Sequence, residues 1–320
     1  MCSRRTTPET IDAYPFQIHD LDVFDDEMLH HLLSSPAFDV PGLAWSMQDG
    51  AAPAFVERVR AQLPAERLPM FEQALHQPIS TVCRERARRR LLKALFWDLT
   101  YWKTPELYEE LTEGERLHPE LLRQLQSEIQ DRVVLDAGAG TGRATFACLR
   151  HGARQVYAVE PSPGLRHLLE CKCQQDPLGE RVRCLAGRFD ALPLADKSVD
   201  IALSCSAFTA DDEQGGEPGL AELRRVTRDG GKILILAPRM VDLPWFQGRG
   251  FQHVSFPADG SVIQFRSFEA AVRCARHFYA HNRAMLDYIL SRRCSAVPCS
   301  IVGVKPLNDY CWLQVTGKDG

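Results

Sequence analysis

Long apolar runs and an excess of charge of one sign are both missing from this sequence. No stretch reaches the roughly 18 apolar residues that a membrane-spanning helix needs, and no apolar signal segment follows Met1–Arg5. The formal net charge of -4 gives no reason to expect strong binding of the whole surface to nucleic acid or to an acidic membrane. We therefore expect a cytoplasmic protein that does not span a membrane.

Cysteine pairs with metal-binding spacing are missing as well. The eleven cysteines are an odd number and lie scattered along 320 residues, which favours reduced thiols over a disulfide framework. The tightest pair, Cys171 and Cys173, has a single intervening residue, which is the wrong spacing for a zinc knuckle, and no second pair follows it. We expect no metal site in an otherwise ordinary globular composition of 45% hydrophobic and 25% charged residues.

The chain up to residue 95 predicts a helical, loop-rich extension, and residues 96–320 predict a separate domain. The basic run at 84–90 is followed directly by apolar residues, which favours an amphipathic helix with a solvated basic face over a nucleic-acid contact. Residues 96–102 hold four aromatic side chains. They predict either a core stripe or a lid that closes over a ligand, in which the Tyr101 hydroxyl supplies a polar group.

From residue 133 onward short apolar runs alternate with helical stretches. The runs lack the period-two alternation of half-exposed strands, which predicts a parallel sheet covered on both faces. In such sheets the ligand lies outside the carboxyl ends of the strands, where Asp136, Glu160 and Ser204 fall. The predicted strands are 133–136, 156–160, 182–186, 201–204 and 232–236.

The pattern after residue 238 changes. It predicts a hairpin of 252–256 with 262–265 about a turn at Asp259 and Gly260. A long helix from about 268 to 291 and two closing strands, 300–304 and 311–315, complete the expected domain.

A glycine turn follows the first predicted strand. Gly138, Gly140 and Gly142 come after an apolar run that ends in Asp136, and a helix is expected to begin near Thr141. Glycines there let a ligand approach the backbone closely. Glu160, twenty residues beyond Gly140, ends the second strand, where a carboxylate can accept two hydrogen bonds from a ribose diol.

The spacing of the glycines separates two ligands. A dinucleotide-binding turn places its third glycine three residues beyond the second, whereas this chain has Arg143 there and Gly142 one residue earlier. The carboxylate of Asp136 would repel a pyrophosphate and would favour an ammonium group. The turn therefore fits the amino-acid end of S-adenosylmethionine better than a dinucleotide.

At these residues the chain closely resembles the class I S-adenosylmethionine-dependent methyltransferases. The resemblance covers about 96–240 and rests on four ordered motifs at 135–142, 159–162, 192–200 and 222–232. It implies an α/β fold with a Rossmann-like, seven-stranded, mostly parallel sheet flanked by helices. It also implies S-adenosylmethionine as the methyl donor and S-adenosylhomocysteine as the product.

The resemblance also implies roles for individual residues. Asp136 and the turn serve the methionine portion, Glu160 binds the ribose hydroxyls and Ser204 faces the methyl donor. The family often has Gly-Asp-Ala-Glu at 187–190, whereas Arg188 stands here in place of the acidic residue credited with binding adenine. Either Asp190 or a backbone carbonyl takes that role, and Arg188 is expected to point to solvent. The expected cofactor-binding residues are Tyr101, Asp136, Ala137, Gly138, Gly140, Thr141, Gly142, Glu160, Pro161, Phe189, Asp190 and Ser204.

The acceptor is less constrained. Residues 204–208 stand where methyltransferases of exocyclic nucleic-acid amines have an Asn-Pro-Pro-Tyr-like sequence, and their small, apolar character suits a small organic acceptor with an O, N, C or S nucleophile. RNA or protein methylation guided by the basic run, and binding of S-adenosylmethionine without turnover, are the alternatives. The extension up to residue 95 is expected to cap the acceptor site or to form a homodimer.

No catalytic base can be selected from the sequence. Histidine has a pKa that suits proton transfer near neutral pH, and a base is optional in methyl transfer. His277 and His281 are four residues apart and are expected to share one face of a helix. The candidates are His118, His253, His277 and His281.

Overall fold

The computed structural model describes residues 15–317, and these form two units. The helical unit comprises residues 15–104 together with 275–283, and the sheet unit comprises 105–274 together with 284–317. The start of the chain, on which the expectation about a signal segment rests, lies outside the described residues. No helix in the described part is long and apolar enough to cross a bilayer.

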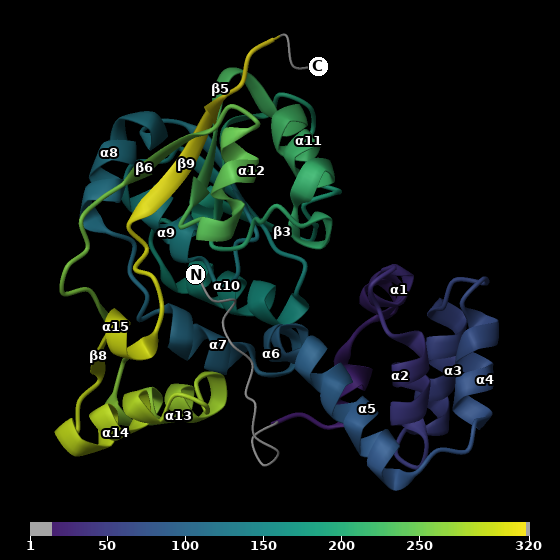
Figure 1. The fold of residues 1–320 in the computed structure, drawn as a ribbon. Helices are drawn as coiled ribbons and strands as arrows, with labels where there is room; N and C mark the ends of the chain where they lie inside the picture. Colours follow the sequence, from purple (N-terminus) through teal and green to yellow (C-terminus); the bar gives the residue numbers. More distant parts are fainter. Residues whose placement is uncertain (1–14, 318–320) are drawn as a thin grey trace. The chain divides into compact units, whose positions relative to one another are not determined.

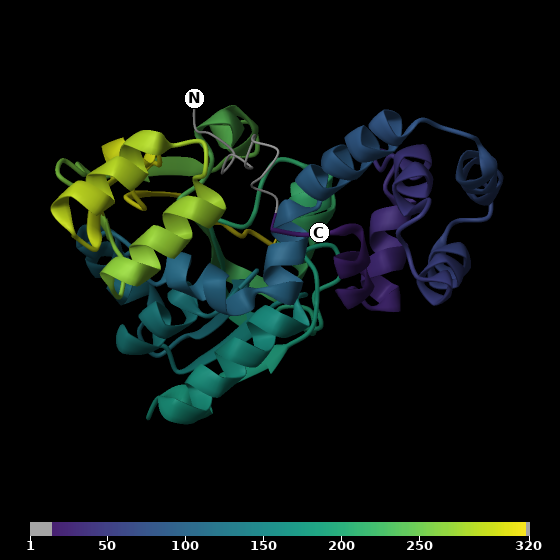
Figure 2. The same ribbon diagram turned by 90° about the horizontal axis from the view of Figure 1, so that it is seen from below.

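The helical unit is a set of short helices without strands (Figure 2). Local signals start several of them: Asp25 caps the first α-helix by accepting a hydrogen bond from the amide of Met28 at 2.8 Å, and Pro53 occupies the first turn of another. The helices are η1 (Ile18–Val23), α1 (Asp26–Ser34), α2 (Val40–Met47), α3 (Pro53–Gln62), α4 (Leu68–His76), α5 (Thr81–Ala94) and α6 (Phe96–Lys103).

The aromatic segment forms α6 and belongs to this unit. Phe96 is fully buried, and its ring lies 5.9 Å from that of Phe16 and 5.4 Å from that of His277. Trp102 packs edge-on against Phe24 at 5.6 Å. The sequence pattern ended the extension at residue 95, whereas these contacts group α6 with the helices before it. Phe96 is therefore a core residue.

The sheet unit is built on a seven-stranded sheet of strand order β3-β2-β1-β4-β5-β9-β6, which confirms the predicted Rossmann-like fold (Figure 1). The pairs from β3 to β5 are parallel, and β9 runs antiparallel to both of its neighbours, β5 and β6. A second sheet pairs β7 with β8. The strands are β1 (Val133–Ala137), β2 (Gln155–Val159), β3 (Val182–Leu185), β4 (Val199–Cys205), β5 (Thr227–Leu236), β6 (Gln252–Ser255), β7 (Val262–Gln264), β8 (Ala296–Pro298) and β9 (Asp309–Gln314).

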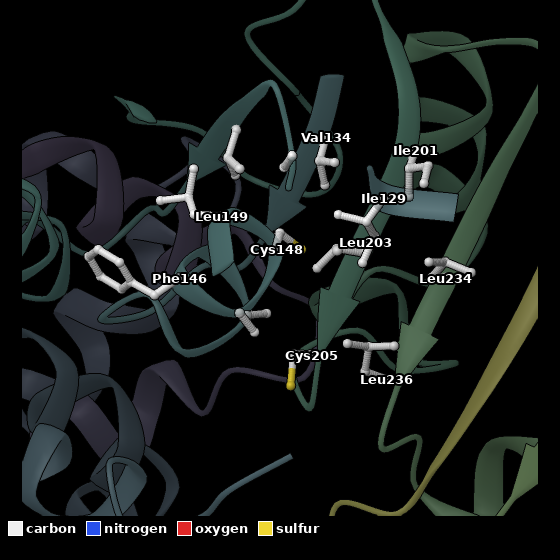
Figure 3. Packing of buried hydrophobic residues seen from close by; sticks show 14 of the residues in the cluster. Ile129, Val134, Phe146, Cys148, Leu149, Ile201, Leu203, Cys205, Leu234 and Leu236 are labelled. Carbon is white, nitrogen blue, oxygen red and sulfur yellow. The ribbon is translucent and has the colours of Figure 1, made fainter. Parts of the chain in front are cut away.

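Helices cover both faces of the large sheet, as the unalternating apolar strands require. One face packs against apolar residues of α8 and α9, and the other against α11 and α12. Figure 3 shows Val134, Leu203 and Leu234 of three adjacent strands with Cys148 and Leu149 of α9. The α-helices after residue 104 are α7 (Pro105–Thr112), α8 (Pro119–Ile129), α9 (Arg143–Arg150), α10 (Pro163–Gln175), α11 (Gly216–Val226), α12 (Leu243–Gln247), α13 (Phe268–Phe278), α14 (Arg283–Arg292) and α15 (Cys299–Val302). The end of α13 and the first residue of α14 belong to the helical unit.

The predicted hairpin is wrong, because its two strands belong to different sheets. β6 pairs with β9 in the large sheet, with His253 opposite Cys311, while β7 pairs with β8, with Val262 opposite Pro298. Gly260 does make a turn, with φ +72°. The turn therefore connects two strands of different sheets, because each of them pairs with a strand from later in the chain.

Two further predictions beyond residue 265 are wrong. The expected long helix is interrupted between Phe278, which ends α13, and Arg283, which begins α14. Asn282 stands immediately before α14, at a position that favours Asn. The expected strand 300–304 is the helix α15, which ends at Gly303 with φ +80°, a common way to stop a helix.

The packing of β4 gives a first testable expectation. Leu203 is fully buried in the centre of the sheet, so Leu203→Ala leaves a cavity and lowers the free energy of unfolding by about 2–5 kcal/mol. Val241→Ala, at a side chain that is 63% exposed, changes it by less than about 0.5 kcal/mol. Urea denaturation of both variants measures the difference. Equal losses would contradict the burial of Leu203 in a packed core.

Candidate active site

The order of the large sheet reverses between β1 and β4, and this position marks the site. β1 lies between β2 and β4, so the chain leaves β1 toward one side and reaches β4 on the other. In open α/β sheets a crevice forms outside the carboxyl ends of the strands at such a point. The glycine turn, Glu160 and Ser206 follow β1, β2 and β4 there.

The glycine turn is docked on the end of β2. The amides of Gly138 and Ala139 both donate to the carbonyl oxygen of Val159, at 2.9 and 3.0 Å. Gly138, Gly140 and Gly142 have φ of +70°, +56° and +95°, in the region where a side chain is strained. The turn is therefore held open by backbone conformations that favour glycine.

The last two glycines differ in what surrounds them. A Cβ on Gly142 would lie 2.5 Å from Leu169 and 2.9 Å from Phe146, so this glycine permits the packing of α9 against α10. A Cβ on Gly140 would meet only the ring of Tyr108, at 3.7 Å. The backbone at Gly140 therefore has open space beside it on the side where a Cβ would lie. The helix α9 begins at Arg143, slightly later than expected, because Gly142 serves as its N-cap.

Glu160 lies directly after β2, and its side chain binds the backbone of the glycine turn. Its Oε2 accepts a hydrogen bond from the amide of Gly140 at 2.8 Å, and its Oε1 accepts one from the amide of Ser162 at 2.9 Å. The residue is 5% exposed, and burial raises its pKa to about 7 although both amides oppose the shift. Pro161 stands between the two bonded positions. A carboxylate oxygen can accept more than one hydrogen bond, and the binding of a ribose diol by Glu160 stays a prediction.

Asp136 is placed differently from Glu160. It is fully buried in β1, its Oδ2 accepts a hydrogen bond from the Thr145 hydroxyl at 2.6 Å, and Oδ1 has no partner among the described residues. Burial raises its pKa to about 6. The carboxylate therefore bonds to α9 beneath the turn, and its direct contact with a ligand stays a prediction. Thr141 and Ala137, in the same stretch, are also buried.

Phe189 lies beside the first glycine of the turn. Its ring would be 3.0 Å from a Cβ on Gly138, and it packs edge-on against Phe208 at 5.1 Å. Arg188 was expected to point to solvent, but its Nε donates to Asp190 Oδ1 at 3.2 Å and its side chain is 24% exposed. This pairing makes Asp190 less available to adenine. The adenine contacts of Phe189 and Asp190 stay predictions.

The end of β4 presents Ser206 rather than Ser204. Ser204 is fully buried in the sheet, and its hydroxyl has no partner among the described residues. Ser206 has φ +59°, an uncommon conformation for a residue with a side chain, and its hydroxyl lies 3.3 Å from a guanidinium nitrogen of Arg143. The role of Ser204 beside the methyl donor stays a prediction.

Arg143 and Glu115 are site residues that sequence reasoning missed. The guanidinium of Arg143 pairs with Glu115 Oε2 at 2.9 Å and reaches Cys205 Sγ at 3.6 Å. A sequence signal exists only for Arg143, which stands at the position of a glycine in the dinucleotide pattern. Nothing local marks Glu115, because its position depends on the packing of the segment around α7.

The histidine candidates are spread over the structure. His118 stacks on Phe256 with ring centroids 5.8 Å apart, and His253 Nε2 lies 2.9 Å from Asp309 Oδ2. His277 is in the helical unit, where burial lowers its pKa to about 4. His281 lies beyond the end of α13, so the expectation that it shares a helix face with His277 is wrong. Tyr101 also belongs to the helical unit, and its contact with the cofactor stays a prediction.

No group of metal-ligating side chains occurs among residues 15–317. The cysteines in this range are free thiols.

Comparison with known proteins identifies the family. Residues 135–235 match the model of a methyltransferase domain. An uncharacterised methyltransferase of Geobacillus sp. (strain WCH70) is 32% identical over 168 residues, which are 50% of this chain and 75% of that protein. The chain belongs to the class I S-adenosylmethionine-dependent methyltransferases. Its methyl donor is accordingly S-adenosylmethionine.

Other methyltransferases also match part of the chain. An uncharacterised methyltransferase of Mycobacterium tuberculosis (strain H37Rv) is 34% identical over 179 residues, which are 53% of this chain and 68% of that protein. A solved structure of an S-adenosylmethionine-dependent methyltransferase from Mesorhizobium loti is 21% identical with a TM-score of 0.30, and the match covers 36% of this chain and 51% of that one.

The crowding around Gly142 leads to a prediction about the turn. Gly142→Ala adds a clash with Leu169 to the strain of φ +95°, while Gly230→Ala, at φ +78°, has no atom within 4 Å of the added Cβ. We expect Gly230→Ala to cost about 1 kcal/mol of unfolding free energy. Gly142→Ala should cost about 1–3 kcal/mol more. Urea denaturation compares them, and equal costs would show that packing at Gly142 is not tight.

Proposed function

We propose that this methyltransferase transfers a methyl group to a small organic molecule through an O, N, C or S nucleophile. The observation that carries the proposal is the loop after β4. Ala207 lies so close to the turn that its Cβ would be 2.8 Å from a Cβ on Gly138, and Phe208 is 2% exposed. The loop is thus folded tightly against the turn, with Ala207 nearest to it, and this close packing supports an acceptor of small size.

The basic run in α5 also supports a small acceptor. Arg88 donates to the carbonyl oxygens of Ser46 and Gln48, at 2.8 and 2.7 Å, and pairs with Glu85 at 2.8 Å. Arg84 pairs with Asp49. These arginines bind the end of α2 within the helical unit, where a C-terminal carbonyl favours a cation. They are engaged in structural contacts, which weakens the alternative of a nucleic-acid contact.

The residues of the site have distinct tasks in this reaction. S-adenosylmethionine, when bound, supplies a methyl group that is open to in-line displacement. Glu160 would hold the ribose, and Gly140 allows close approach of the ligand to the backbone. The acceptor nucleophile has to lie about 3 Å from the methyl carbon, so the remaining task is to position it and exclude water. No residue is assigned as a base.

Methyl-transfer assays distinguish this proposal from its alternatives. A cell extract is separated by size, and each fraction is incubated with the protein and tritiated S-adenosylmethionine. We expect label in the small-molecule fraction, and less of it from the Glu160→Ala variant at the same concentration of S-adenosylmethionine. Label in RNA or protein would favour the macromolecular alternative. Binding of S-adenosylmethionine without label in any fraction would favour a binding protein without turnover. The cytoplasmic location and the cap or dimer role of the extension stay predictions.

The hydrogen bonds of Glu160 predict the effect of its removal. Glu160→Ala removes a charged acceptor from the ribose and from the amides of Gly140 and Ser162. We expect the binding free energy of S-adenosylmethionine to fall by about 1.5–3 kcal/mol, the usual value for a hydrogen bond to a charged group. Calorimetric titration measures it, with the exposed Glu213→Ala as control. Unchanged affinity in Glu160→Ala would overturn the ribose assignment.

The raised pKa of Glu160 predicts a pH dependence of binding. Burial raises this pKa to about 7, so the ligand-free residue is mostly protonated at pH 6 and mostly ionised at pH 8. The ribose hydroxyls bond best to the ionised form, so binding releases a proton and strengthens as pH rises. We expect S-adenosylhomocysteine to bind about tenfold more tightly at pH 8 than at pH 6.

Titration calorimetry in buffers of different ionisation enthalpy detects the released proton. Glu160→Gln should remove most of the pH dependence. Asp136, with a pKa raised to about 6, ionises in the same range, so Asp136→Asn serves as the matched variant and should retain the dependence near pH 7. The same slope in Glu160→Gln as in the original protein would assign the proton to another group.

A further inference from the structure

The segment 105–115 lies against the glycine turn. A Cβ on Gly140 would be 3.7 Å from the ring of Tyr108, which lies in α7. Lys172 of α10 donates both to Glu109 Oε1 of α7, at 2.6 Å, and to the carbonyl oxygen of Thr141 in the turn, at 2.8 Å. One ammonium group thus connects this segment with the turn. All these residues belong to the sheet unit.

The same segment brings Glu115 to Arg143. The carboxylate of Glu115 is 8% exposed as a side chain, and the guanidinium of Arg143, one residue beyond Gly142, is 17% exposed. Their contact of 2.9 Å places one negative and one positive charge side by side next to the turn. Arg143 also reaches Ser206 at the end of β4. The pair therefore lies between the carboxyl ends of β1 and β4.

The ligand offers a matching pair of charges. The amino-acid end of S-adenosylmethionine carries one carboxylate and one ammonium group. Asp136, the acid expected to attract the ammonium, is fully buried: its Oδ2 is bonded to Thr145, and its Oδ1, which has no partner among the described residues, is enclosed by the protein. The amides of Gly138 and Gly140 already donate within the protein. The partners of the two ligand charges have to be sought elsewhere beside the turn.

We propose that Arg143 binds the carboxylate and Glu115 the ammonium group of the cofactor's methionine portion. Each protein charge then keeps an opposite charge beside it when the ligand enters, because the four groups can alternate in sign. This matters because a buried charge without a partner costs more than a buried charge that keeps an opposite charge beside it. A planar guanidinium also suits a carboxylate, to which it can donate two parallel hydrogen bonds. The inference rests on the cofactor site described above.

Two ligands that differ only by the amino acid test the proposal. S-adenosylhomocysteine carries the amino-acid end, and 5′-methylthioadenosine lacks it but keeps the adenosine and the thioether. Arg143→Met and Glu115→Gln are each expected to weaken S-adenosylhomocysteine about 10- to 100-fold, as for the loss of a hydrogen bond between charged groups. Both should change the dissociation constant of 5′-methylthioadenosine less than about threefold. Arg143→Lys, which keeps the charge, should recover part of the loss.

A matched control comes from another ion pair of the same segment. Glu113 pairs with Arg266 at 2.7 Å, with side chains that are 30% and 47% exposed. Glu113→Gln removes an acid of the same type near Glu115 and should leave both dissociation constants unchanged. If Glu113→Gln discriminated between the ligands as Glu115→Gln does, general loss of negative charge would explain the result, and the specific role of Glu115 would be overturned.

The outcomes separate this proposal from the assignment of the site itself. Equal weakening of both ligands by Arg143→Met and Glu115→Gln would show that the pair only supports the fold, and would overturn the proposal. If Arg143→Met does not fold, Glu115→Gln and Arg143→Lys decide by the same ratio of dissociation constants. If the unaltered protein bound 5′-methylthioadenosine as tightly as S-adenosylhomocysteine, no residue would recognise the amino acid. Failure of the unaltered protein to bind either ligand would instead contradict the cofactor site.

Discussion

The site depends on the two hydrogen bonds that the buried carboxylate of Glu160 accepts from backbone amides. One amide is that of Gly140 in the glycine turn, and the other is that of Ser162, whose hydroxyl caps α10. A single side chain thus connects the end of β2 with the turn after β1 and with the next helix. Burial makes ionisation of this acid unfavourable, and the two amides offset part of that cost. The position of Gly140 and the charge of Glu160 are therefore coupled.

Three acids near the turn differ in surroundings, and this difference divides their roles. Asp136 is enclosed by the protein and accepts a hydrogen bond from Thr145, so it connects β1 with the first turn of α9. Glu160 bonds to backbone amides at the edge of the sheet. Glu115 pairs with Arg143 and comes from a segment that precedes β1 in the chain. Sequence motifs mark only the first two, although all three lie around one short turn and contribute to its electrostatic field.

The sequence predicted what is determined locally. The glycine turn, the parallel strands and Glu160 at the end of β2 follow from apolar runs and from the spacing of glycines and acids. The region after residue 238 was predicted poorly, because its strands pair with distant parts of the chain. Residues of β6 pair with β9 residues 54 to 60 positions away, and residues of β7 pair with β8 residues 32 to 36 positions away, so local turn signals cannot reveal these partners. Glu115 could not be predicted for a related reason. Its segment, 105–115, is positioned by ion pairs with residues distant in the sequence, namely Glu109 with Lys172 of α10 and Glu115 with Arg143.

The helical unit includes residues 275–283, which follow most of the sheet unit in the chain. Phe278 stacks on Trp97 with ring centroids 5.5 Å apart, and His277 contacts Phe96, so late residues complete the aromatic core of α6. The chain therefore enters this unit twice, and a single cut cannot excise it intact. If a complete helical domain had simply been fused before the sheet unit, its core would contain no residues from later in the chain. The contacts of residues 275–283 with α6 do not fit such a fusion.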